Sequence, residues 1–544
     1  MEVTFLSLIP PLLVLFSAFI TKDIIKSLVL GILSATLIAT NFSITNTIKL
    51  TGIKLWENSE IGKLTSWNNF LSNQNLFIFS FIICVGIIIT LIAYSGGTYA
   101  YSKLMRSKIE SAKGAEAATF FLSSLLFVDD FFNSLTVGSV MHSVTDSFKI
   151  PRAKLAFLVH SMATPLSILI PISSWVGFIL TQLKTSGIDA NVTNSTLIIV
   201  NPFFIFLSSI PYVFYSLILI TSVWFIIRKR ISFGKMYQHE KIAQKTGNLF
   251  GNQPELNHTM QDANKRNKKN SSIYDMILPI SFLIFSALFN ILYSGNYWLL
   301  GGENSLVKTL QASNFMQSLF LSGIITLIFC ILFFLFRGKI LFTEMPKIFN
   351  EGFMLMASTI VILILAWTFG NLLKDYLHTG DYIANILISS VDIRLLPFLF
   401  FLTGAITSFS IGSSWATIAI LIPIAIPMLI SFSGVAIPTN AENIIGFLPT
   451  LGAIFSGAIF GDHTSPIGSA SIMAAKSSGC NLMDHVQTQL AYAIPVFIST
   501  AIAFLMAGFL NKFSFVINLS ISLVSGILIC LLILSIRDKM QKRS

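Results

Sequence analysis

The stretch Phe127-Val128-Asp129-Asp130-Phe131-Phe132-Asn133 places two adjacent carboxylates in the middle of a hydrophobic segment. A second stretch, Phe460-Gly461-Asp462-His463-Thr464-Ser465-Pro466, places another carboxylate in similar surroundings. A carboxylate at bilayer depth is costly, so it usually faces the interior of a helix bundle or a wet cavity. We therefore predict that Asp129, Asp130 and Asp462 bind a proton, a cation or a basic partner inside a membrane protein.

The composition supports a membrane setting. Of the 544 residues, 54% are hydrophobic and only 11% are charged, whereas ordinary soluble domains carry about 25% charged residues. The chain is long enough for many spans of about 20 apolar residues each. Its net charge of +11 would suit a nucleic-acid-binding protein, but the Lys and Arg residues stand in short loops between apolar runs. That pattern is typical of loops on the cytoplasmic side of a membrane, and it predicts an all-α polytopic membrane protein.

The first acidic pair lies in a segment that is flanked by basic residues on both sides. The apolar stretch 117–141 follows Lys103, Arg106, Lys108 and Lys113 and precedes Lys149, Arg152 and Lys154. If both flanks are cytoplasmic, this stretch enters and leaves the membrane from one side as a re-entrant hairpin. Non-helical backbone at that depth requires protein or a water-filled cavity around it. We expect the acidic pair near the tip of the hairpin.

A basic segment divides the chain into two membrane halves. Residues 228–270 hold ten Lys or Arg against three acids, which is typical of a cytoplasmic, largely flexible linker. We expect an N-terminal half over 1–227, the linker over 228–272 and a C-terminal half over 273–544. The C-terminus, from Arg537 to Arg543, is also basic and is expected on the cytoplasmic side.

A short motif occurs once in each half. Ser173-Ser174-Trp175 and Ser413-Ser414-Trp415 each lie in an apolar run beside a helix breaker, Pro171 or Gly412. Paired interrupted segments in two halves point to the binding site of a transporter, although so short a match also arises by chance. The acidic clusters do not follow the same order as the motifs, because one acidic cluster precedes its Ser-Ser-Trp and the other follows it. They are therefore not obvious repeat mates.

Other polar residues lie in the same segments. Asn133 and Thr136 follow the acidic pair at about one-turn spacing, so they share its face if the chain is helical there; a Thr in this setting also often bonds its own backbone. His463 stands beside Asp462, and an imidazole and a carboxylate can exchange a proton near neutral pH. His160 is interpreted as a packed residue, and His485 as part of a helix start.

Several of these stretches resemble the signatures of NhaC-type Na+/H+ antiporters. The resemblance rests on Asp129 to Gly138, Arg152 to Ala156, Pro171 to Trp175, Gly412 to Thr417 and Phe460 to Pro466, with further matches around Gly479 and Asp484. It implies two inverted repeats with re-entrant hairpins and broken helices, and a site where they meet. It also implies sodium and protons as coupling ions, in some members with an organic acid or amino acid, and the inner membrane of a prokaryote.

The sequence departs from that family pattern at two positions. A serine, Ser469, stands where the family commonly has an acid, and His160 stands where it tends to have aspartate. Fewer carboxylates weaken the binding of a hard cation such as sodium. The departures leave room for another substrate or another coupling ratio.

The resulting hypothesis is a secondary antiporter that exchanges Na+ for H+. Asp129, Asp130 and Asp462 would bind the proton or the sodium ion, and Trp175 and Trp415 would pack at the helix breaks. The residues expected to line the site are Asn133, Thr136, Ser173, Ser174, Ser413, Ser414, His463 and Ser465. No cofactor is expected, and no P-loop pattern suggests direct use of ATP.

Three other functions remain open at this stage. The nearest keeps the fold and moves a small organic acid or an amino acid, driven by Na+ or H+. An intramembrane enzyme that uses Asp129 with Asp462, or His463 with Asp462, would need neither a repeat nor a gradient. A passive channel would conduct without counter-ion coupling. The lipid bilayer is the expected surrounding, and a homodimer is retained as a candidate assembly.

Overall fold

The computed structural model describes residues 5–21, 24–60, 62, 74–192, 195–251, 271–379, 382, 391–466 and 468–543. Almost all regular structure in these residues is helical, apart from one parallel pair of short strands, β1 (Ile188–Asp189) and β2 (Ile198–Ile199). Within this described part, eight helices are long and apolar enough to cross a membrane, or up to ten if each of two bent pairs forms one span. The prediction of an all-α polytopic membrane protein is confirmed.

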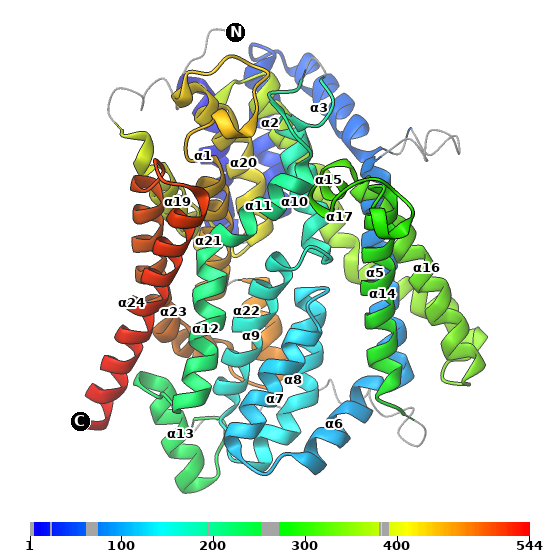
Figure 1. Ribbon diagram of the computed structural model, residues 1–544, viewed down its shortest axis with the longest axis vertical. Coiled ribbons are helices and arrows are strands. Elements are labelled where there is room, and N and C mark those ends of the chain that lie inside the picture. Colours follow the sequence, from blue (N-terminus) through cyan, green and yellow to red (C-terminus); the bar gives the residue numbers. More distant parts are fainter. Residues whose placement is uncertain are drawn as a thin grey trace.

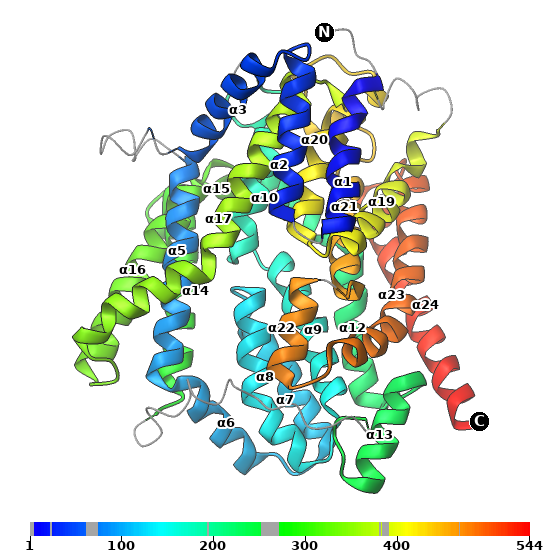
Figure 2. The ribbon, with the colours of Figure 1, turned by 180° about the vertical axis from the view of Figure 1, so that it is seen from behind.

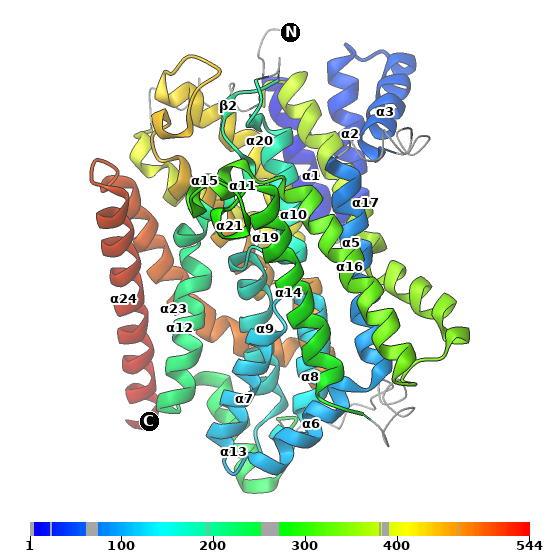
Figure 3. The same cartoon turned by 45° about the vertical axis from the view of Figure 1, so that its right-hand side comes forward.

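The peripheral helices surround the centre of the molecule (Figures 1 and 3). At one end of the long axis lie α1 (Ile9–Thr21), α2 (Ile24–Ala39) and α3 (Ile44–Ser59). A bundle to one side consists of α5 (Gln74–Ser95), α14 (Tyr274–Ser294), α16 (Phe315–Phe336) and α17 (Met345–Asp375). The opposite side is formed by α12 (Phe214–Lys229), α23 (Leu482–Phe509) and α24 (Phe515–Arg543). Shorter connecting helices are α6 (Gly97–Lys108), α11 (Pro202–Ser209) and α15 (Leu306–Ala312).

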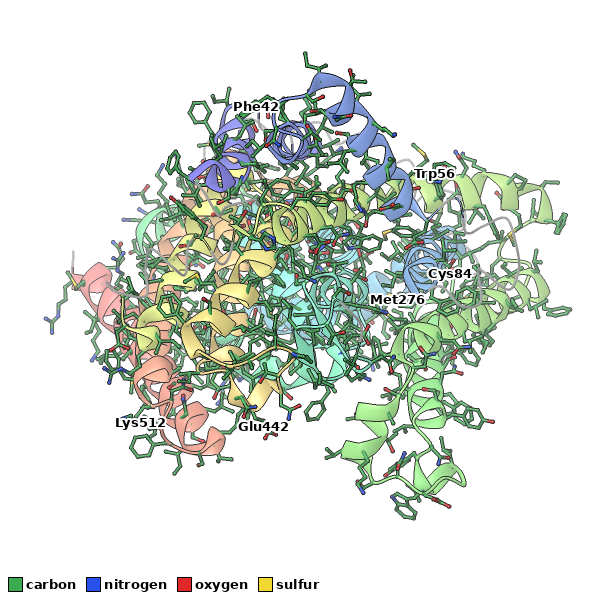
Figure 4. All side chains as sticks on the ribbon, turned by 90° about the horizontal axis from the view of Figure 1, so that it is seen from above. Phe42, Trp56, Cys84, Met276, Glu442 and Lys512 are labelled. Carbon is green, nitrogen blue, oxygen red and sulfur yellow. The ribbon has the colours of Figure 1, made fainter. Side chains whose placement is uncertain are left out.

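The view along the long axis separates these two groups. Cys84 of α5 and Met276 of α14 mark the side bundle, and Lys512, which precedes α24, lies on the other side of the molecule (Figure 4). The central helices that carry the predicted site residues lie between the two groups.

The first acidic pair lies at a turn between two short helices. Helix α7 (Ala112–Leu125) ends before the pair, and α8 (Asp130–Ser147) begins with it. The two helices pack against each other and both lie in the lower half of the molecule in Figure 1. They therefore form a hairpin that opens to one end, with Asp129 and Asp130 at its tip, as the basic flanks of this stretch predicted.

The next two helices form a broken span. Helix α9 (Arg152–Leu169) occupies the lower half, and α10 (Ser174–Thr185) continues in the upper half at an angle of 49° (Figure 1). The break spans Ile170 to Ser173, where Pro171 has no backbone N–H to continue the helix. Ser173 is the N-cap residue of α10.

The C-terminal half repeats the two units upside down. Helices α19 (Leu396–Ile411) and α20 (Ser414–Ser433) form a hairpin in the upper half, joined at Gly412, whose φ of 72° favours glycine. Helix α21 (Phe447–Thr464) then descends to a break, and α22 (Ser469–Ser478) continues in the lower half (Figures 1 and 2). Each hairpin packs against the second helix of the broken span in the other half: α8 packs against α22, and α20 packs against α10. The hairpin and broken span of the second half are therefore inverted relative to those of the first half, as the family resemblance implied.

Part of the expected flexible linker is folded. Helix α13 (Gly234–Thr246) lies at the lower end and packs against α9 and α23. Lys154 at the start of α9 is buried between Glu116 of α7, 3.2 Å away, and Glu240 of α13. Arg230 also pairs with Glu116. The linker residues 252–270 lie outside the described residues, so the expectation of flexibility there stays a prediction.

Small residues bring α19 and α21 into close contact. A Cβ added at Gly457 would lie 2.4 Å from the backbone oxygen of Phe401, and one at Gly461 would lie 2.4 Å from the backbone nitrogen of Phe409. Small residues allow helix backbones to approach closely in membranes. This contact fixes the position of α21, which carries Asp462.

We expect Gly457→Ala to destabilise the protein, because the new methyl group would overlap a backbone atom that cannot rotate away. Overpacking of this kind costs about 1–3 kcal/mol. The matched control is Gly52→Ala, where a Cβ would meet nothing within 4 Å; in a helix that change stabilises by up to about 1 kcal/mol. Thermal unfolding of the purified variants in detergent should therefore shift in opposite directions. An unchanged midpoint in Gly457→Ala would contradict the close contact.

Candidate functional site

The first acidic pair is built into the start of α8. The backbone oxygen of Asp129 accepts the first-turn hydrogen bond from Asn133 N at 2.9 Å, and Asp130 is the first residue of the helix. Their exposed fractions are only 2% and 3%. Negative side chains in the first helical turn interact favourably with the helix dipole, so the local structure helps to hold these charges inside the protein.

The broken span supplies the hydrogen-bond donors for this pair. Ser174 Oγ donates to Asp129 Oδ2 at 2.9 Å, and Trp175 Nε1 donates to Asp130 Oδ1 at 3.2 Å. From α9, Thr164 Oγ1 donates to Asp130 Oδ2 at 3.4 Å. The hairpin tip is therefore bonded to both sides of the break between α9 and α10.

The third carboxylate lies at the end of α21. Asp462 is 4% exposed, and its Oδ2 accepts a hydrogen bond of 2.9 Å from Ser414 Oγ at the start of α20. Its Oδ1 is buried and has no hydrogen-bond partner. A Cβ at Gly468 would lie 2.7 Å from Oδ1. The unpartnered oxygen therefore faces the chain between α21 and α22, and glycine leaves room beside it.

The same serine–aspartate hydrogen bond joins the hairpin to the broken span in both halves, but the two elements exchange which residue they supply. In the first half, the acid lies on the hairpin and the Ser-Ser-Trp motif on the broken span. In the second half, the motif lies on the hairpin and the acid on the broken span. Ser174 and Ser414 are the middle residues of the two motifs, and each donates to its aspartate at 2.9 Å. This exchange explains why the acidic clusters and the motifs occur in opposite order along the sequence.

The two half-sites meet at the tryptophans. The rings of Trp175 and Trp415 lie edge to face with centroids 5.4 Å apart. Across this contact, the carboxyls of Asp130 and Asp462 are close enough to interact electrostatically. The predicted packing residues therefore join the two inverted units, and the predicted carboxylates share one central region.

Helix dipoles and hydroxyls surround the carboxylates in this region. In the described residues, no lysine or arginine forms an ion pair with Asp130 or Asp462. The contacts above also bring together the N-termini of α8, α10, α20 and α22, which carry partial positive charge. No set of three or more His, Cys, Asp or Glu side chains in the described part is arranged to hold a metal ion. A sodium ion here would need hydroxyl or backbone oxygens in addition to carboxylates.

The remaining predicted residues have several different environments. Asn133 is fully buried and its Nδ2 donates to the backbone oxygen of Ser123 at 2.7 Å, which closes the hairpin, while its Oδ1 has no partner. Ser173 Oγ donates to the backbone oxygen of Ser167, and Ser413 Oγ accepts from Ala416 N, so both hydroxyls stabilise the breaks. Thr136 is buried within α8, and His463 and Ser465 are buried at the C-terminal end of α21.

Sequence reasoning missed several contacts. Thr164 was not among the predicted site residues, yet it bonds Asp130. Tyr215, whose hydroxyl lies 3.4 Å from His463 Nδ1, comes from α12, and no pattern in the sequence connects the two residues. His485, interpreted as part of a helix start, lies 2.9 Å from His160 across the same region.

Comparison with known proteins adds a family and relatives. The model of the Na+/H+ antiporter family matches residues 167–509. An uncharacterized protein of Haemophilus influenzae is 29% identical over 513 residues, which cover 92% of this chain and 91% of that protein. The malate-2H(+)/Na(+)-lactate antiporter of Bacillus subtilis is 35% identical over 107 residues, 20% of each chain. An uncharacterized Na(+)/H(+) antiporter of Haemophilus influenzae is 27% identical over 161 residues, 30% of this chain and 31% of that protein.

Proposed function

This chain belongs to the Na+/H+ antiporter family, and from that premise we propose that it exchanges Na+ for H+ across the membrane as a secondary active antiporter. The observation that carries the proposal is the pair of buried carboxylates, Asp130 and Asp462, which interact electrostatically across the two inverted units and form no ion pair with a Lys or Arg of the described residues. A mobile cation or proton is the remaining way to neutralise such groups.

In the proposed cycle, Asp129, Asp130 and Asp462 bind protons and sodium in competition. Ser174 and Ser414 orient the carboxylates and offer hydroxyl oxygens to the ion. The free Oδ1 of Asp462 is the natural point of first contact, because it has no hydrogen bond to give up. The proposed site lies where two inverted repeats meet. Movement of one repeat against the other would therefore open the site to one side of the membrane and then to the other.

The proposed orientation follows the positive charge. The lower end in Figure 1 carries α13 and the C-terminus, and the basic residues concentrate in the linker and the C-terminal tail. We place this end in the cytoplasm by the positive-inside rule, and the protein in the inner membrane of a prokaryote.

Reconstitution tests the function directly. Purified protein is reconstituted in liposomes loaded with a pH-sensitive dye, and a sodium gradient is applied. Protons should move opposite to sodium, so the lumen should become alkaline when sodium enters and acidic when sodium leaves. Protein-free liposomes and potassium gradients serve as controls. A protein that moves radioactive sodium without any proton movement would contradict Na+/H+ exchange, and proton movement that occurs without sodium would contradict it equally.

A small organic anion is the second candidate substrate. Four helix N-termini meet beside the site, and such ends favour carboxylates; a relative over part of the chain is named as a malate and lactate antiporter. Under this alternative, sodium or protons would drive exchange of a small organic acid or amino acid. Counterflow of labelled malate, lactate and amino acids in the same liposomes separates the two, because simple Na+/H+ exchange predicts no counterflow of any of them.

A further inference from the structure

Three histidines far apart in the sequence form one buried cluster beside the carboxylate site. His160 comes from α9, His463 from α21 and His485 from the first turn of α23, and all three have 0% exposure. His160 Nδ1 lies 2.9 Å from His485 Nε2. The rings of His160 and His463 are packed with centroids 4.4 Å apart. His463 is the sequence neighbour of Asp462, so the cluster extends from α23 to the proposed ion site.

The cluster has free nitrogens at its ends. His160 Nε2, His463 Nε2 and His485 Nδ1 are buried and have no hydrogen-bond partner. Burial of an unpaired polar group is costly, and a structural histidine would normally satisfy both ring nitrogens. In the bond between His160 and His485 one neutral ring must donate and the other accept. Each ring therefore has one engaged nitrogen and one available nitrogen.

Few groups around the cluster could stabilise a permanently protonated imidazole. The titratable groups that act on His160 are His463 from α21 and His485 from α23. Tyr215 of α12 faces His463, and Gln489 of α23 donates to Ser161 beside His160. Several charged groups on the packed helices have partners of their own: Asp130 bonds Thr164 and Trp175, Glu116 and Glu240 pair with Lys154, and Arg152 pairs with Asp146. The acids next to the cluster in the sequence are Asp462 beside His463 and Asp484 beside His485.

We propose that the His160–His485 pair is a proton-transfer site that connects the first turn of α23 with the region of Asp462. The inference rests on the proposed Na+/H+ exchange and specifies the path of its proton. Histidine is suited to this role because it accepts and releases protons near neutral pH, and buried histidines in membrane proteins are used in proton relays.

The transfer conserves protons. A proton binds to the bare Nδ1 of His485, and the proton on His485 Nε2 crosses to His160 Nδ1. The proton on His160 Nε2 then leaves toward the side of His463. One proton enters and one leaves. Afterwards His160 Nδ1 donates the hydrogen bond and His485 Nε2 accepts it, the reverse of the starting direction. Rotation of the rings, or transfer of a proton in the opposite direction, restores the starting state. His485 itself is buried, but it lies near the surface, since Asn481 and Met483 in the same turn are exposed.

Two isosteric replacements isolate proton transfer from packing. Asn places its amide near the position of His Nδ1, so His160→Asn keeps a group that can bond His485. Gln places its amide near Nε2, so His485→Gln keeps the partner of His160. Neither amide takes up and passes on a proton. The control is His239→Gln on α13, a histidine outside the cluster.

The assay compares two reactions of the reconstituted protein. Sodium-for-sodium exchange, followed with radioactive sodium at equal concentrations on both sides, needs no proton movement. Sodium-driven proton movement needs the relay. We expect each cluster variant to lose at least about tenfold in proton movement and to retain sodium-for-sodium exchange within about twofold, while His239→Gln keeps both reactions.

Other outcomes overturn the inference. If either cluster variant moves protons at the wild-type rate, the pair is not on the proton path. If both reactions fall together in every cluster variant, the histidines have a structural role only. If the wild-type protein moves sodium but no protons, the proposed function fails and the relay with it.

Discussion

Asp462→Asn is expected to reduce Na+/H+ exchange to the level of protein-free liposomes, a loss of at least about a hundredfold. Asparagine has nearly the same shape and can still accept the hydrogen bond that Ser414 donates to Asp462 at 2.9 Å. It carries no charge and binds no proton in the working range. The change therefore removes the chemistry of the carboxylate while keeping its packing, and the reaction is measured with the pH-sensitive dye described above.

The matched control for this change is Ser414→Ala. It removes the donor to Asp462 but leaves the carboxylate, and the backbone oxygen of Ala458 retains a second donor in Ser408. A typical hydrogen bond to a charged group contributes about 1.5–3 kcal/mol, so we expect exchange that is weakened but still measurable. Asp462→Asn with wild-type exchange would exclude this carboxylate from the site.

Asp129→Asn is expected to abolish exchange to the same extent, because the inverted half-site uses the same arrangement. Ser174 Oγ donates to Asp129 Oδ2 at 2.9 Å, as Ser414 does to Asp462. Asparagine at 129 keeps the backbone oxygen that accepts from Asn133 N, so the start of α8 should remain intact. Sodium uptake and proton movement are both measured, since the loss of one alone would assign this carboxylate to a single ion.

The control here is Ser174→Ala, which should weaken exchange about as much as Ser414→Ala if the two half-sites are equivalent. A large effect of Asp462→Asn together with full activity of Asp129→Asn would mean that only the second half-site binds the ion. In that case the symmetry between the halves would be structural, and Asp129 would serve to hold the hairpin tip against α10.

Much of the architecture could be predicted from the sequence. Hydrophobic composition and basic loops predicted a polytopic helical protein, and the basic flanks of 117–141 predicted the hairpin whose tip carries Asp129 and Asp130. These features depend on neighbouring residues, and local hydrophobicity and charge decide whether a segment enters a membrane. The Ser-Ser-Trp motifs also marked the interrupted segments correctly, since Pro171 and Gly412 act locally on the backbone.

The pairing of the site residues could not be predicted in this way. Because the acids and motifs occur in opposite order along the chain, the two acidic clusters were not obvious repeat mates, whereas the inverted folding of the halves bonds Ser174 to Asp129 and Ser414 to Asp462. His160 was interpreted as a packed residue and His485 as part of a helix start, yet they lie 2.9 Å apart.

Hydrophobic runs and charges act on the segment in which they occur, so the buried carboxylates of a helical membrane protein could be inferred from the chain alone. Which hydroxyl faces which carboxylate, and that three imidazoles share one site, depends on the packing of the helices. Those contacts join residues separated by 34 to 325 positions, and their distances depend on how whole helices pack, which no local pattern encodes.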